Sequence, residues 1–138
     1  MTVRKSERGE NLLAVFVKAA DLLAYTIRTV CNEKHFRQRY RYETGTPCVD
    51  LARQIMHSVT FAEMIVVKDQ QSRDARIAYQ RAALQCCEAL KSEITMANLH
   101  FGLNADKAGT WIDLIDTWKE TCIAWIHADK KRYAGIGD

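Results

Sequence analysis

The fold is decided by residues 105–133, ADKAGTWIDLIDTWKETCIAWIHADKKRY. Apolar side chains recur in this stretch at spacings of three and four residues, which places them on one face of a helix. The members of this row are Trp111, Ile115, Trp118, Cys122 and Trp125. Such a row is typical of a long helix inside a bundle. A second row, of Ile112, Ile123 and Ile126, widens the apolar face, so we expect some apolar surface to be buried between subunits.

Three further segments carry apolar rows of the same helical spacing. The row of residues 10–33 is Leu12, Phe16, Ala19, Leu23, Ile27 and Val30; that of residues 47–68 is Cys48, Ala52, Ile55, Val59, Ala62 and Val66; that of residues 73–100 is Ile77, Leu84, Cys87, Leu90, Ile94 and Ala97, with Phe101 just beyond. The second of these segments also has a surplus of apolar side chains, in Met56, Met64 and Val67. No segment has the alternation typical of a strand.

Helices at residues 10–33, 47–68, 73–100 and 104–132 predict an all-α fold, an antiparallel up-down-up-down four-helix bundle. The 138 residues suit a single domain, residues 1–138, with one core. Thr46 and Pro47 predict the N-cap and first turn of the second helix, and Ser72 predicts the cap of the third. Gly102 predicts a left-handed end to the third helix, and Asn104 predicts the cap of the fourth.

The composition indicates an ordered and mildly basic protein. Hydrophobic residues make up 48% of the chain, and the formal net charge is +3. The five cysteines include no CxxC pair, so neither a disulfide framework nor a zinc site is indicated. Cys31, Cys48, Cys87 and Cys122 fall at apolar helical positions, so we expect reduced core thiols and a cytoplasmic location. The N-terminal residues lack a signal-peptide pattern, and no apolar run reaches the ~18 residues of a membrane span.

The sequence offers no pattern of catalytic or metal-binding residues. Iron-binding bundles use Glu-x-x-His pairs, which this chain lacks, and it has neither a glycine-rich phosphate loop nor a nucleophile elbow. Asp113 and Asp116 fit a solvated helix face better than a pair of catalytic acids. The three tryptophans fit a packed core better than a clasp around a flat ligand, because they fall on the apolar row. We therefore expect no enzyme, metal or cofactor.

Two basic clusters remain after the core positions are assigned. Residues 33–47, EKHFRQRYRYETGTP, carry Lys34, Arg37, Arg39 and Arg41 among the aromatic side chains of Phe36, Tyr40 and Tyr42. Arginine binds phosphate oxygens with two donors and aromatic rings stack on bases, so this stretch is either a nucleic-acid surface or a charged connection.

The second basic cluster, Lys130, Lys131 and Arg132, ends the fourth helix. There the helix dipole alone stabilises cations, so no partner is needed to explain these residues. In an up-down bundle the two clusters lie at opposite ends, and only an oligomer or an extended nucleic acid would contact both.

The whole pattern resembles the small four-helix-bundle proteins related to Avd, the accessory variability determinant of diversity-generating retroelements. The resemblance covers residues 12–135. It rests on the aromatic and aliphatic first helix, the basic link ending in RYRYETGT, the helices with CVDLARQIMHSVTFAEMI and RIAYQRAALQCCEALKSEITMA, and the terminal AWI followed by HADKKRYAG. A sister group is encoded in intervening sequences of bacterial large-subunit ribosomal RNA genes.

The resemblance implies a ring-like homopentamer that binds RNA or DNA and a retroelement reverse transcriptase, as a non-enzymatic cofactor of mutagenic copying. It places the nucleic-acid-binding surface on Arg37, Arg39, Arg41, Arg53, Lys130, Lys131 and Arg132. The alternative is a structural or protein-interaction oligomer that binds no nucleic acid, of the ribosomal-intervening-sequence type.

Overall fold

The computed structural model describes residues 5–34 and 36–136 of the chain. These residues form four α-helices and no strand, which confirms the predicted all-α class. The helices are α1 (Lys5–Cys31), α2 (Thr46–Met64), α3 (Gln70–Phe101) and α4 (Ala105–Arg132). Between α1 and α2 lie a 3₁₀ turn, η1 (Gln38–Tyr40), and a π-helical turn, η2 (Arg41–Gly45).

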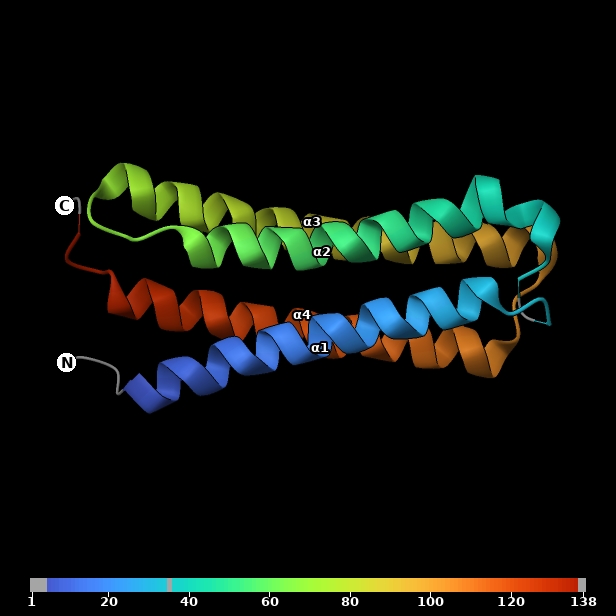
Figure 1. The fold of residues 1–138 in the computed structure, drawn as a ribbon, viewed down its shortest axis with the longest axis horizontal. Coiled ribbons are helices and arrows are strands. Elements are labelled where there is room, and N and C mark those ends of the chain that lie inside the picture. The colour runs from blue at the N-terminus through green and yellow to red at the C-terminus, as the bar shows by residue number, and fades with distance from the viewer. Residues whose placement is uncertain (1–4, 35, 137–138) are drawn as a thin grey trace.

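The helices lie in two layers, with α1 beside α4 and α2 beside α3 (Figure 1). Each helix runs along the length of the molecule (Figure 1). Residues 32–34, 36–45 and 102–104 therefore lie at one end, here called the α1–α2 end. Residues 65–69 and 129–136 lie at the other, here called the α2–α3 end.

Tryptophans of α4 fix its contact with α1. The whole predicted row of α4 is buried. Trp111 Nε1 donates to Thr26 Oγ1 at 3.0 Å, and Trp118 Nε1 donates to the Val15 carbonyl at 3.1 Å. A buried indole N–H without an acceptor is costly, so α1 must present these oxygens to α4.

The face of α1 that is buried differs from the predicted one, because α1 must present these acceptors to α4. Among residues 12–31 of α1, the buried ones are Val15, Ala19, Leu22, Thr26, Thr29 and Val30. Leu12, Phe16 and Leu23, which the apolar spacing placed at the centre of the face, are only partly buried. The predicted face was therefore wrong by part of a turn, because two threonines occupy core positions.

The second layer is held together by small side chains. Ala52 and Ala62 of α2 and Ala83 and Ala97 of α3 are buried, and they allow these two helices to approach closely along most of their length. In α4, by contrast, the bulky indoles hold the backbone further from its neighbours. The second apolar row of α4 is mostly used within the subunit, because Ile112 and Ile126 pack on the core while Ile123 is exposed.

Two of the predicted helix caps were wrong and two are confirmed. Thr46 has helical backbone angles and continues from the π-helical turn, so it is not an N-cap. The cap of α3 is Asp69, whose side chain accepts from the Ser72 N–H at 2.8 Å. Ser72 is the third helical residue, and its hydroxyl accepts from the Asp69 N–H, which completes a capping box. Gly102 is left-handed at φ 65°, and Asn104 Oδ1 accepts from two N–H groups of α4, as predicted.

The second helix ends before its predicted limit. α2 stops at Met64, and Ile65 is extended. Val66 was predicted to belong to the apolar row, but it is 79% exposed, because it lies in the connection to α3. Met64 is likewise exposed, whereas Met56 packs against the core.

The substitution Trp111→Phe tests the contact between α1 and α4. We expect it to lower the free energy of unfolding by about 1–3 kcal/mol, because the buried Thr26 hydroxyl loses its donor. The neighbouring Tyr25→Phe removes an exposed hydroxyl that donates to the Lys107 carbonyl, so it should lower the free energy of unfolding by less than about 1 kcal/mol. Urea unfolding followed by circular dichroism measures both, and equal losses would contradict the assignment.

Candidate nucleic-acid interface

The aromatic residues of the connection between α1 and α2 are mostly part of the core. Phe36 is fully buried, and its ring meets that of Phe101 edge-on, with 4.8 Å between centroids. The Tyr40 ring also contacts Phe101. The two rings are stacked, with 4.5 Å between their centroids and 7° between their planes. Only Tyr42 is exposed among the three aromatic residues predicted to meet bases. The aromatic side chains of the connection therefore mainly close the end of the bundle, and they offer little surface for binding.

Gly45 is required where this connection enters α2. A Cβ atom on Gly45 would lie 2.7 Å from Val30 Cγ1 and 3.2 Å from Phe36 Cε1. Both neighbours are buried and cannot move without disturbing the core. The close approach holds Gly45 and Phe36 against Val30 at the end of α1.

Arg41 acts as a cap for the end of α1. Its Nε donates to the Val30 carbonyl at 3.0 Å, and its Nη2 donates to the Cys31 carbonyl at 2.8 Å. The last carbonyls of a helix have no partner inside the helix, and a cation there also offsets the helix dipole. The Nε and Nη2 donors of Arg41, a residue predicted to bind phosphate, are therefore already used within the fold.

Three of the predicted cations are exposed at or near the α1–α2 end. Arg37 precedes η1, Arg39 lies over the Tyr40 ring at 4.8 Å, and Arg53 lies in the second turn of α2. Among the ion pairs of the described residues, none involves these three side chains. They can therefore meet an external anion without first breaking an ion pair.

Sequence reasoning missed two further cations at the same end. Arg28 and Lys107 line a pocket of about 290 Å³ together with Tyr25, Thr29 and Asn32, and no carboxylate belongs to that lining. Arg28 lies in the last turn of α1 and Lys107 in the first turn of α4. The signal that would have found them was the predicted topology, which brings these two helix ends together.

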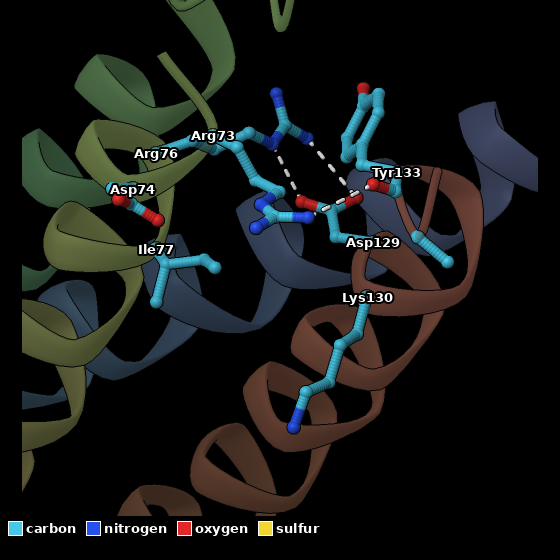
Figure 2. Close-up of a pocket in the computed structure, with 8 residues that line it drawn as sticks. Arg73, Asp74, Arg76, Ile77, Asp129, Lys130 and Tyr133 are labelled. Carbon is cyan, nitrogen blue, oxygen red and sulfur yellow. Dashed lines mark hydrogen bonds and ion pairs between the residues drawn. The ribbon is translucent and has the colours of Figure 1, made fainter. Parts of the chain in front are cut away.

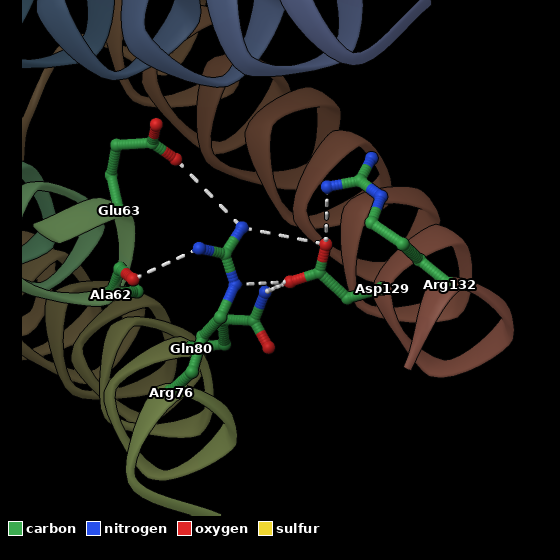
Figure 3. A network of polar contacts seen from close by, with 6 residues as sticks. All are labelled: Ala62, Glu63, Arg76, Gln80, Asp129 and Arg132. Atoms are coloured by element: carbon green, nitrogen blue, oxygen red, sulfur yellow. Dashed lines mark hydrogen bonds and ion pairs between the residues drawn. The ribbon is translucent and has the colours of Figure 1, made fainter. Parts of the chain in front are cut away.

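The second predicted cluster lies at the opposite end of the molecule (Figure 1). Lys130 and Lys131 are exposed, whereas Arg132 turns inward toward Asp129 (Figure 3). The nearest approach there is 3.5 Å, between Arg132 Nη1 and Asp129 Oδ1. Of the three basic residues that end α4, only the two lysines are fully available to a partner.

Asp129 is the centre of a buried polar network that the sequence did not reveal (Figure 3). Arg76 Nε donates to Asp129 Oδ2 at 2.6 Å, and Gln80 Nε2 donates to the same oxygen at 2.8 Å. Arg76 Nη1 also donates to the Ala62 carbonyl of α2 at 3.1 Å. The network therefore joins three helices, and we call Arg76, Gln80, Asp129 and Arg132 the Asp129 network.

The spacing of α3 held a signal for this network. Its buried row continues backward from Ala83 at steps of three and four to Gln80 and Arg76. The predicted row was based on apolar residues alone. It therefore included Ile77 and Leu84, which are only partly buried. A buried arginine and glutamine were passed over because these residue types usually lie at the surface.

The cysteines divide into core and surface thiols. Burial raises the pKa of Cys48, Cys87 and Cys122 to about 12, so these thiols stay protonated at neutral pH. Partial burial also raises the pKa of Cys86. Cys31 is exposed at the end of α1, so its predicted place in the core was wrong.

Within residues 5–34 and 36–136, no group of three or more His, Cys, Asp or Glu side chains is arranged to hold a metal ion. No helix among these residues combines the length and apolar character needed to cross a membrane. No protein-family model, curated protein or solved structure matches the chain.

The substitution Arg41→Gln separates capping from binding. We expect it to lower the free energy of unfolding by about 1–2 kcal/mol, because two carbonyls at the end of α1 lose a charged donor. The exposed Arg39→Gln should change that free energy by no more than about 0.5 kcal/mol. Thermal and urea unfolding of both variants measure the difference, and an unchanged Arg41→Gln protein would refute the capping role.

Proposed function

We propose that this protein is a non-enzymatic accessory protein that binds nucleic acid, RNA or its DNA copy, through the α1–α2 end. The observation that carries the proposal is the group of exposed cations at or near that end. They are Arg28, Arg37, Arg39, Arg53 and Lys107. Arginine and lysine that lack a carboxylate partner attract phosphate, and several such contacts together give useful affinity. The acids of the connection, Glu33 and Glu43, weaken this field without cancelling it.

We further propose that the nucleic acid belongs to a diversity-generating retroelement and that the second partner is its reverse transcriptase. Support for this step comes from the resemblance in helix order, the basic link RYRYETGT and the terminal AWI with its basic tail. Lys130 and Lys131 would contribute from the α2–α3 end, and the protein would act in the cytoplasm. A reverse transcriptase gene with a repeated template region beside the gene of this protein would agree with the proposal.

We also propose that the subunit is an antiparallel up-down-up-down bundle that assembles into a ring-like homo-oligomer, with five subunits implied by the resemblance. Exposed apolar side chains on both layers support assembly. Leu13, 63% exposed, and Val17 lie on α1, whereas Met64, 72% exposed, and Phe61 lie on α2. Apolar side chains exposed on two helices can serve head-to-tail contacts, which form a ring when the rotation between subunits closes.

The alternative function is a structural oligomer that binds proteins and no nucleic acid. The observation that favours it is the structural use of Arg41, Phe36 and Tyr40, which leaves the connection with fewer groups to offer to RNA. The exposed apolar patches serve this function equally well. Nucleic-acid affinity at physiological salt decides between the two.

A triple variant tests nucleic-acid binding. We expect Arg37→Gln, Arg39→Gln and Arg53→Gln together to reduce the slope of log K against log salt for single-stranded RNA by roughly 2, because three phosphate contacts are lost. The control is Arg81→Gln, Lys91→Gln and Lys119→Gln, which removes the same charge from α3 and α4, where Lys91 and Lys119 are paired with Asp116 and Glu88. Fluorescence anisotropy over a salt series gives both slopes. Equal slopes in the two triple variants would contradict a site at the α1–α2 end.

The assembly has a separate test. We expect light scattering of the purified protein to give a multiple of the 15.8 kDa subunit mass, and Val17→Glu or Met64→Glu alone to lower it, because each places a charge in a proposed contact. Tyr42→Glu, at an exposed position of the connection, should leave the mass unchanged. A wild-type protein that scatters as a monomer would refute assembly through these patches.

A further inference from the structure

The Asp129 network contains more buried positive than negative charge. The side chains of Arg76 and Asp129 are 6% and 4% exposed, and that of Arg132 is 13% exposed. Both guanidinium groups therefore share one carboxylate (Figure 3). A buried cation is stable only when an anion compensates it, and Asp129 supplies one negative charge to two arginines.

One donor of this network has no acceptor. Arg132 Nε is buried and makes no hydrogen bond to any described residue. Since Asp129 Oδ1 lies 3.5 Å from Arg132 Nη1, even the existing contact of this guanidinium is long. Buried donors are nearly always paired, so the Arg132 guanidinium is less well satisfied than that of Arg76. The buried Nε itself is out of reach of a ligand, and any further acceptor would have to meet the Nη atoms.

One further carboxylate, that of Glu63, borders the network and does not fill this role. Glu63 Oε2 lies 3.8 Å from Arg76 Nη2, and the Glu63 side chain is 41% exposed. No contact between Glu63 and Arg132 occurs among the ion pairs of the described residues. Glu63 therefore stands at the rim, where it opposes an incoming anion without neutralising Arg132.

A pocket opens beside both arginines. It has a volume of about 520 Å³, and Arg76, Arg132, Glu63, Trp125 and Tyr133 are among its lining residues. The ring of Trp125 lies 5.5 Å from the Arg76 guanidinium carbon, and that of Tyr133 lies 5.7 Å from the guanidinium carbon of Arg132. Rings in these positions hold the planar guanidinium groups before any ligand arrives.

A second pocket beside Arg76 is lined by further cations. This pocket, of about 300 Å³, is lined by Arg73 and Lys130 as well as by Arg76 and Asp129 (Figure 2). Arg73 Nη1 donates to the Tyr133 carbonyl at 3.4 Å, which ties the tail of α4 to α3. The cations that line the two pockets are Arg73, Arg76, Lys130 and Arg132, and the acids are Glu63, Asp74 and Asp129, so positive charge is in excess.

We propose that the pocket beside Arg76 and Arg132 binds a phosphate group. Arginine donors that are already oriented match the several oxygens of phosphate, and the pocket is far larger than a halide ion needs. The phosphate is either inorganic phosphate or the terminal phosphate of a nucleic-acid strand. Only the second source rests on the proposed nucleic-acid function.

Inorganic phosphate is the probe for the pocket itself. In thermal unfolding we expect saturating phosphate to raise the Tm by roughly 3–8 °C over chloride at equal ionic strength. Arg132→Gln should abolish this rise, and Glu63→Gln should enlarge it, because the opposing carboxylate is gone. The control Lys131→Gln changes an exposed cation that lines neither pocket, so it should keep the full rise.

The phosphate-induced rise in Tm should disappear in Arg132→Gln and grow in Glu63→Gln. Because a general loss of fold would not produce these opposite changes, the result does not depend on either variant's stability. A wild-type Tm that responds equally to phosphate and chloride would overturn the proposal. So would a rise that survives in Arg132→Gln, provided its circular dichroism spectrum matches the wild type.

Oligonucleotides then separate the two sources of phosphate. If the source is a strand end, a 5′-phosphorylated RNA should bind more tightly than the same RNA with a 5′-hydroxyl, and Arg132→Gln should remove the difference. If both RNAs bind equally while inorganic phosphate raises the Tm, the pocket serves free phosphate. Failure of RNA binding with a positive phosphate response would refute the proposed function and leave the pocket intact.

Discussion

The buried ion pair between Arg76 and Asp129 is the contact on which one whole end of the molecule depends. It joins α3 to α4, and through the Ala62 carbonyl it also joins α2. Removal of one member of a buried pair leaves the other charge unpaired, at a cost of about 3–5 kcal/mol. Because this contact fixes the last turn of α4, it also holds Arg132, which lies beside Asp129 (Figure 3).

The helices could be predicted from sequence more reliably than the faces they bury. The row of Trp111, Trp118 and Trp125 was assigned correctly because large apolar rings dominate the spacing. The same rings carry an N–H that needs an acceptor, and apolar spacing says nothing about acceptors. Thr26 was therefore missed in α1 and Gln80 in α3, although both are fully buried. Polar core positions depend on partners from another helix, which only the folded chain supplies.

The surroundings of the predicted basic residues could be anticipated only in part, for a related reason. Positive charge selected two stretches in which only some of the cations are fully exposed. Arg41 donates to two carbonyls at the end of α1, and Arg132 pairs with Asp129. An arginine beside a helix end meets unpaired backbone carbonyls, and these compete with any external phosphate. Arg37 and Arg39 escape this competition: Arg37 precedes the short 3₁₀ turn η1 and Arg39 lies within it, and neither donates to the carbonyls at the end of α1. Arg28 and Lys107 show the converse, since two unremarkable helix residues become neighbours through topology.

The distance between the two basic ends limits how one subunit can bind nucleic acid. α4 has 28 residues, so it is about 42 Å long. That length is several times the Debye length of about 8 Å at physiological salt, so neither end feels the charge of the other. A duplex would need about 12 base pairs to reach from one end to the other, at 3.4 Å per step. Within the proposed ring, by contrast, like ends of neighbouring subunits would lie side by side. The few cations of each subunit would then act on the same strand, and a weak contact repeated around the ring would become a strong one.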